Sequence, residues 1–102
     1  MDRLEVLKSM VAQDPHNSFA RYGLAMEYAN GGDLAQAVEE FQRLLDADAS
    51  YVAAYYHAGQ ALEKLGRLDD ARAVYGRGLD AAGRKGDLHT RSEIQAALDL
   101  LG

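Results

Sequence analysis

An internal repeat constrains this chain more than any other feature of its sequence. When residues 18–51 are aligned with residues 52–85, nine of the 34 positions are identical, where this composition gives about three by chance. The identities include Ala20/Ala54, Tyr22/Tyr56, Gly32/Gly66, Leu34/Leu68, Ala37/Ala71 and Leu45/Leu79. A unit of this size does not bury its apolar face alone, so the repeat predicts neighbouring units that stack around a shared core.

Each unit is expected to form two helices around a turn, because the 102 residues include 18 Ala, 14 Leu and a single Pro. In the first unit, Asn17 or Ser18 caps the first helix and Asn30-Gly31-Gly32 ends it. Asp33 then caps the second helix, with Gln36 as its capping-box partner. In the second unit, Ser50 is the expected cap, and Leu65-Gly66 is the expected turn.

The second helix of each unit carries an apolar stripe at helical spacing. In the first unit the stripe is Leu34, Ala37, Val38, Phe41, Leu44 and Leu45. In the second unit it is Leu68, Ala71, Val74, Tyr75, Gly78 and Leu79. Small residues are expected where the two helices of a unit cross, since they let the backbones approach closely; these are Ala25, Gly59, Ala37 and Ala71.

These units resemble the tetratricopeptide repeat, a helix–turn–helix unit of about 34 residues. The small residues Ala25 and Gly59, the alanines Ala37 and Ala71, and the aromatic pair Phe41/Tyr75 match that pattern. Arg21 departs from it, because the family often has Trp at this position. The resemblance implies an all-α fold, a short right-handed α-solenoid with a C-terminal capping helix.

The same frame divides the whole chain into one domain of four parts: a half repeat (1–17), repeat one (18–51), repeat two (52–85) and a capping helix (86–102). Asp14-Pro15-His16-Asn17 resembles the turn between repeats of the family. The apolar face of the half repeat is Leu4, Leu7, Met10 and Val11. The inward side of the last helix is expected to be Leu88, Ile94, Ala97, Leu98 and Leu101.

Composition excludes several classes of function. With 11 Lys+Arg against 16 Asp+Glu, the net charge is −5, which disfavours binding to nucleic acid or to an anionic membrane. The absence of Cys rules out disulfides, thiol catalysis and Cys-based zinc sites. No apolar run is long enough to span a bilayer, and the N-terminus lacks the pattern of a signal peptide. A cytoplasmic protein is therefore expected.

No combination of residues in the sequence indicates an enzyme, a cofactor or a metal site. The three histidines, His16, His57 and His89, lie in separate segments without metal-ligand spacing. No phosphate-binding loop or nucleophile motif occurs. The adjacent acidic pairs Glu39-Glu40 and Asp69-Asp70 are interpreted as solvated helix faces.

The resemblance implies instead a protein-binding groove lined by the first helix of each repeat. Counted in the family's frame, the groove residues are Phe19, Tyr22, Gly23, Met26, Ala53, Tyr56, His57, Gln60, Asp87, Thr90, Arg91 and Ile94. We select Phe19, Tyr22, Met26, Tyr56, His57, Gln60 and Arg91 as the peptide-binding residues. The chaperone-tail clamp of the family is rejected, because only Arg91 matches it and Asp87 would repel a carboxylate. Tyr and Met favour a peptide or helix with apolar or aromatic anchors.

The sequence leaves two alternatives open. Phe19, Tyr22 and Met26 have a structural role if they pack inside the fold rather than bind a ligand. The protein is also a candidate structural subunit, which forms a homodimer or docks in a larger complex through its terminal helices. The half repeat motivates that alternative, because its apolar face lacks a partner helix within the frame.

Overall fold

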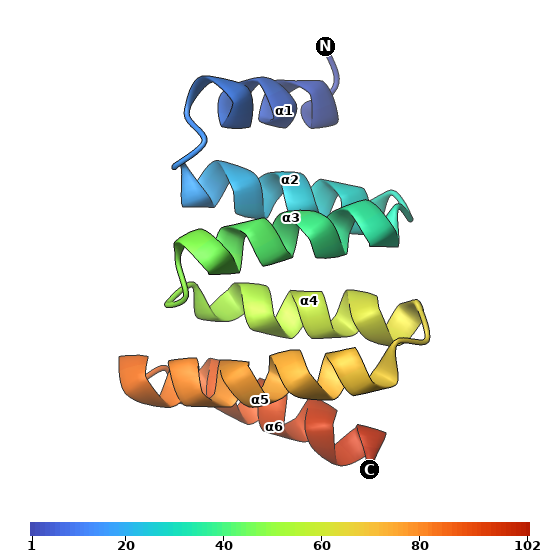
Figure 1. Cartoon of the computed structure of the whole chain (residues 1–102), viewed down its shortest axis with the longest axis vertical. Coiled ribbons are helices and arrows are strands. Elements are labelled where there is room, and N and C mark those ends of the chain that lie inside the picture. Colours follow the sequence, from blue (N-terminus) through green and yellow to red (C-terminus); the bar gives the residue numbers. More distant parts are fainter.

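The computed structural model describes residues 1–102 as six helices and no strands. The helices are α1 (Arg3–Gln13), α2 (Ser18–Asn30), α3 (Leu34–Ala47), α4 (Val52–Lys64), α5 (Leu68–Lys85) and α6 (Leu88–Leu101). They stack in chain order along the longest axis of a molecule of 41 × 28 × 19 Å (Figure 1). This confirms the all-α solenoid of helical repeats. None of the six has the length and apolar character needed to cross a membrane.

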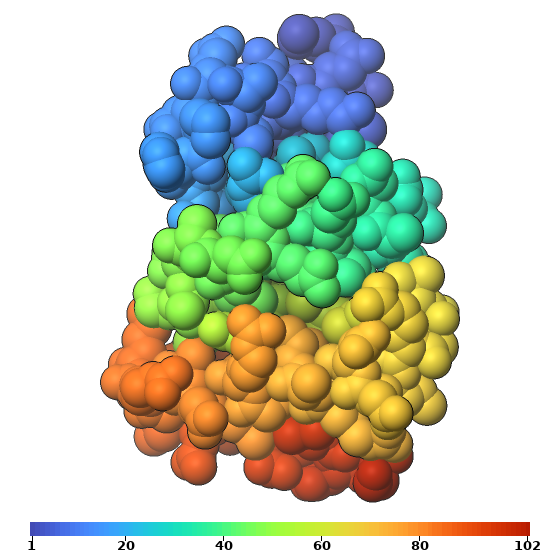
Figure 2. All heavy atoms as spheres, viewed as in Figure 1, coloured from blue at the N-terminus to red at the C-terminus, as the bar shows by residue number.

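The helices form two layers. Helices α2, α4 and α6 make one layer, in which α4 contacts both of its neighbours, and α3 and α5 make the other. Figure 2 shows the second layer, with α3 in green and α5 in orange on the face nearest the viewer. We call the exposed side of α2, α4 and α6 the inner face. It is the side on which the family frame places the groove.

Most of the helix ends follow the predicted caps and turns. As predicted, the side chains of Asn17 and Asp33 accept hydrogen bonds from backbone N–H groups in the first turns of α2 and α3. Asp87, which was expected in the groove, caps α6 in the same way. Gly32 and Gly66 have positive φ values of 87° and 77°, which L side chains rarely adopt. No hydrogen bond from the Gln36 side chain completes the expected capping box.

The expected cap at Ser50 is wrong. The N-cap position of α4 is Tyr51, which makes no side-chain capping bond. The Ser50 hydroxyl instead donates to Asp48 Oδ1 at 2.8 Å. Because the Ser50 hydroxyl bonds to an acceptor two residues earlier, it stabilises the turn before α4 and does not cap the helix.

The core lies where the small residues let paired helices approach. Ala25, Ala37 and Ala71 are fully buried. A Cβ atom built on Gly59 would overlap Cε1 of Tyr75, so the tyrosine ring occupies the space that a side chain would need. The predicted apolar stripes of α3 and α5 are buried or half-buried except at Leu68. Leu68 and Leu88 are exposed, because both lie in the first turns of their helices, beyond the edge of the core.

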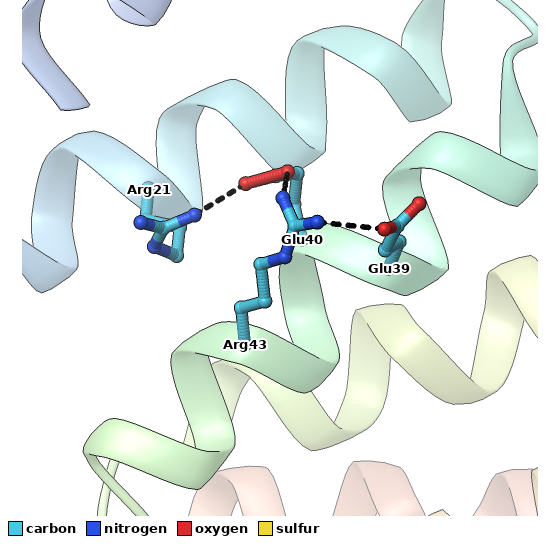
Figure 3. Close-up of polar contacts among 4 residues, drawn as sticks. All are labelled: Arg21, Glu39, Glu40 and Arg43. Carbon is cyan, nitrogen blue, oxygen red and sulfur yellow. Dashed lines mark hydrogen bonds and ion pairs between the residues drawn. The ribbon is translucent and has the colours of Figure 1, made fainter. Parts of the chain in front are cut away.

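The interpretation of Glu39-Glu40 as a solvated pair is wrong for Glu40. Its side chain is 6% exposed and accepts hydrogen bonds from Arg21 Nη1 on α2 at 2.6 Å and from Arg43 Nη1 at 2.9 Å (Figure 3). Arg43 also bonds to the exposed Glu39. Arg21 stands where the family often has Trp, so this ion pair joins α2 to α3 in place of an aromatic contact.

Candidate functional site

The inner face carries a row of three rings from α2 to α4. The centroid of Tyr22 lies 5.9 Å from that of His57, which lies 5.3 Å from that of Tyr56. All three side chains are partly buried, and Tyr22 also meets Phe41 of the core edge-on at 6.3 Å. We call Tyr22, His57 and Tyr56 the aromatic row. Its rings combine core contact with an accessible edge.

Burial shifts the pKa values of two residues in the aromatic row, His57 and Tyr22. Desolvation lowers the pKa of His57, and the nearby Glu93 carboxylate opposes this shift only in part. The imidazole is therefore neutral at pH 7. Desolvation, together with the neighbouring Tyr51, raises the pKa of Tyr22 above its ordinary value, so its hydroxyl stays protonated. Tyr22 and His57 therefore present polar, uncharged rings.

A hollow of about 380 Å³ lies at one end of the row, between α1 and α2. Its apolar lining consists of Leu7, Met10, Phe19, Ala20, Tyr22 and Met26. Phe19 is 75% exposed, so it does not pack beneath α1, and the structural alternative fails for this residue. Arg3 and Glu27 form an ion pair of 3.2 Å at the rim, which leaves the α1–α2 hollow without net charge.

A second hollow of about 340 Å³ lies at the other end, between α4 and α6. It is lined by Tyr56, Gln60, Glu63, Glu93, Ala96, Ala97 and Leu100. Tyr75 is buried behind this hollow. Its hydroxyl donates a hydrogen bond to Glu63 and accepts one from Gln60 Nε2 at 2.6 Å. Burial and the carboxylate of Glu63 raise the pKa of Tyr75 far above its ordinary value, so the hydroxyl remains a donor.

Arg91 does not join the other predicted residues. Its neighbours in a separate hollow of α6 are Leu88, Ser92 and Gln95, and none of these lines the α4–α6 hollow. Ile94, also expected in the groove, is fully buried. Asp87 caps α6. The other six residues selected as peptide-binding lie along the aromatic row or in the two hollows that flank it; they are Phe19, Tyr22, Met26, Tyr56, His57 and Gln60.

Arg91, Ile94 and Asp87 lie outside the flanking hollows because the register of the repeat changes before α6. Helices α2 and α4 begin at the first residues of the two repeats, Ser18 and Val52, but α6 begins at Leu88, two residues later than the same spacing would place it. A frame with a fixed period therefore points two residues too early in α6. The change of register hides Glu93 and Ala96, which the corrected frame aligns with His57 and Gln60. The family frame also omitted other residues that line the two hollows, among them Leu7, Met10, Glu63, Ala97 and Leu100. The signal in the sequence was Gly86-Asp87, which ends α5 in the left-handed conformation and caps α6.

The arrangement defines a helical-repeat scaffold with a surface for protein interaction, and comparison with known proteins agrees. A model of the tetratricopeptide repeat family matches residues 22–87, more than half of the chain. The chain belongs to the tetratricopeptide repeat family, whose fold is typical of non-catalytic adaptors.

Three solved structures illustrate the similarity. A tetratricopeptide repeat domain protein from Salinibacter ruber is 35% identical, covering 83% of this chain and 94% of its own, with a TM-score of 0.79. A protein from Bordetella parapertussis is 31% identical, covering 99% and 88%, with a TM-score of 0.85. PcrH, solved in complex with the chaperone-binding region of PopD, has a TM-score of 0.91 over 96% of this chain and 74% of its own. At 17% identity, PcrH shows similarity of fold alone.

Proposed function

We propose that this protein is a non-catalytic adaptor whose inner face binds a peptide or helical segment of another protein. The observation that carries the proposal is the continuity of the surface. The aromatic row begins at Tyr22, which lines the α1–α2 hollow, and ends at Tyr56, which lines the α4–α6 hollow. A segment laid along the row would therefore reach a hollow at each end.

The chemistry of the lining supports this use. Phe19 is an exposed aromatic beside the flexible side chains of Met10 and Met26. Exposed apolar groups gathered in a hollow are typical of protein-binding sites. Tyr22 and Tyr56 offer apolar area with a hydroxyl, and such anchors carry much of the energy of protein interfaces. The PcrH structure, which holds a region of PopD, is a related fold in use as a protein receptor.

The test is selection of a random peptide display library on the immobilised protein. Peptides selected on the wild type are expected to lose affinity for Phe19→Ala by roughly tenfold, as for truncation of an interface anchor. The control is Leu88→Ala, which removes a side chain of similar exposure (68%) outside both hollows and is expected to leave affinity unchanged. Selected peptides that bind both variants equally would place the binding surface elsewhere.

A second candidate function is self-association through α1. Helix α1 buries none of its side chains, and its apolar residues Val6 and Met10 are each 41% exposed, Met10 within the α1–α2 hollow. A homodimer that pairs these faces would cover them. Val6→Lys is expected to convert such a dimer to monomer in sedimentation velocity. A wild type that stays monomeric at the highest soluble concentration would exclude this candidate.

A further inference from the structure

We propose that the bound segment carries a large apolar side chain for the α1–α2 hollow and a basic side chain, Lys or Arg, for the α4–α6 hollow. This inference rests on the proposed function, because it assigns the chemistry of the partner to the same inner face. It also fixes the direction in which the segment binds, because the two hollows differ in charge and are joined by the aromatic row.

The charge of the α4–α6 hollow favours a cation. Two carboxylates, Glu63 and Glu93, line it, and no Lys or Arg does. An acidic side chain placed there would be repelled. An apolar one would cover the two carboxylates without supplying a counter-ion, which is unfavourable. A basic side chain is attracted by the two carboxylates and supplies their counter-ion, and the net charge of −5 favours its approach.

The walls of this hollow suit the stem of a basic side chain. Ala96, Ala97 and Leu100 supply apolar surface beside the carboxylates, and Leu100 is 89% exposed. The methylene groups of Lys or Arg pack on such surface while the charged end reaches a polar group. The apolar and acidic parts of the hollow thus correspond to the two parts of one side chain.

Glu63 is held in position before any ligand arrives. Its Oε2 atom accepts hydrogen bonds from the Tyr75 hydroxyl and, at 3.3 Å, from Gln60 Nε2. Tyr75 is itself buried, so this support is rigid. Glu93 is freer: its side chain is 44% exposed, and its ion-pair contact is with exposed His89 at 3.5 Å. One carboxylate is therefore fixed and the other can adjust, an arrangement that lowers the entropic cost of binding.

The α1–α2 hollow has no preference for a basic side chain. Its two charged lining residues, Arg3 and Glu27, already neutralise each other across 3.2 Å. The remaining surface is dominated by Phe19, Met10 and Met26. A segment with its apolar anchor here and its basic residue beyond Tyr56 fits in one direction only.

The experiment takes peptides selected on the wild type and compares their affinity for the wild type with their affinity for variants that lack one charge. Among peptides that require Phe19, we expect enrichment of Lys or Arg on one side of the apolar anchor. For such a peptide, Glu93→Gln is expected to weaken binding about threefold to tenfold and to reduce its dependence on salt. The matched control is Asp99→Asn, the same loss of charge on α6 outside the hollow, which is expected to change affinity less than twofold. Replacing the basic residue of the peptide by Gln should remove the effect of Glu93→Gln.

The outcomes separate the two proposals. Peptides that require Phe19 but show no basic enrichment, or that bind Glu93→Gln as tightly as the wild type, would overturn this inference and leave the proposed function standing. Peptides that bind without regard to Phe19 and Tyr22 would overturn the proposed function itself. Glu63→Gln is a second variant, and its thermal unfolding is measured alongside because Glu63 also supports Tyr75.

Discussion

Repeat one (α2 and α3) holds its helices together with a buried ion pair, whereas repeat two (α4 and α5) packs a tyrosine against a glycine. Arg21 and Glu40 of repeat one occupy the positions of Tyr55 and Val74 in repeat two. Tyr55 lies over Gly78, where an added Cβ would come within 2.6 Å of the tyrosine Cβ. Two interiors of different chemistry thus support the same helix pair.

The difference predicts different weaknesses. A buried ion pair loses most when one partner is removed, because the other charge stays buried without compensation. A tyrosine against a glycine loses most when volume is added, because a close-packed interior has no room to spare. Repeat one should therefore be sensitive to loss of charge, and repeat two to the addition of a methyl group.

The largest effect is expected from Glu40→Ala. It leaves Arg21, whose side chain is only 14% exposed, without its partner, and should lower the free energy of unfolding by about 3–5 kcal/mol. Glu39→Ala removes the adjacent carboxylate, which is 52% exposed, and should cost less than about 1 kcal/mol. Urea unfolding followed by circular dichroism measures both. Equal effects at the two positions would contradict the assignment of Glu40 to the interior.

A double variant sharpens this test. Arg21→Met with Glu40→Leu replaces the pair with apolar groups of similar size and should recover most of the stability lost in Glu40→Ala, since such replacements are often neutral or stabilising. A double variant no more stable than Glu40→Ala would mean that the ion pair is needed for more than its charge balance.

Repeat two has a second contact between a tyrosine and a glycine, Tyr75 against Gly59, where repeat one has Phe41 and Ala25. The added volume is tested there by Gly59→Ala. The new Cβ would overlap Cε1 of Tyr75, whose ring is fixed by burial and by the bonds of its hydroxyl. Overpacking should cost about 1–3 kcal/mol, although alanine favours the helix by about 1 kcal/mol. Gly76→Ala is the control, because nothing lies within 4 Å of its added Cβ, and it should stabilise by about 0.5–1 kcal/mol. Thermal unfolding with opposite signs for the two variants is the expected result.

The sequence predicted the two helix pairs because their signals are local. A capping side chain such as Asn17 or Asp33 acts within one turn, and Gly32 and Gly66 occupy conformations that other residues avoid. The burial of Glu40 could not be read in this way. Its partner Arg21 lies 19 residues earlier on another helix, and two adjacent glutamates give no indication of which one faces that helix.

The residues predicted for the groove lie together where the period of the repeat holds and lie apart where it changes. Tyr22 and Tyr56 lie in equivalent places because α2 and α4 each begin at the first residue of a repeat. Helix α5 has 18 residues where α3 has 14, so the inner side of α6 moves from Arg91 to Glu93. Helix α5 ends at Gly86, which is in the left-handed conformation, and a frame of fixed period takes no account of this local signal.

A smaller effect is expected at the starts of the first helices, which also differ between the repeats. Asn17→Ala removes the side chain that accepts from Ala20 N at 3.0 Å and should destabilise the protein by about 1 kcal/mol. Ser50→Ala should cost less than about 0.5 kcal/mol, because its hydroxyl bonds to Asp48 in an exposed turn and caps no helix. Urea midpoints measure the difference. A loss of stability for Ser50→Ala as large as that for Asn17→Ala would indicate that Ser50 does cap α4.

The smallest effect concerns His57, which stands where repeat one has Gly23 and gives repeat two a group that titrates near neutral pH. Burial lowers the pKa of His57 in the folded protein below its ordinary value of 6.5, so the unfolded chain binds the proton more readily. Stability contributed by the neutral ring is fully present above pH 6.5 and is lost as the pH falls through 6.5 toward the lower pKa of the folded state. His57→Gln should flatten the free energy of unfolding across that window and match the slope of the wild type above it. A variant with the wild-type slope below pH 6.5 would show that the imidazole is not desolvated between Tyr22 and Tyr56.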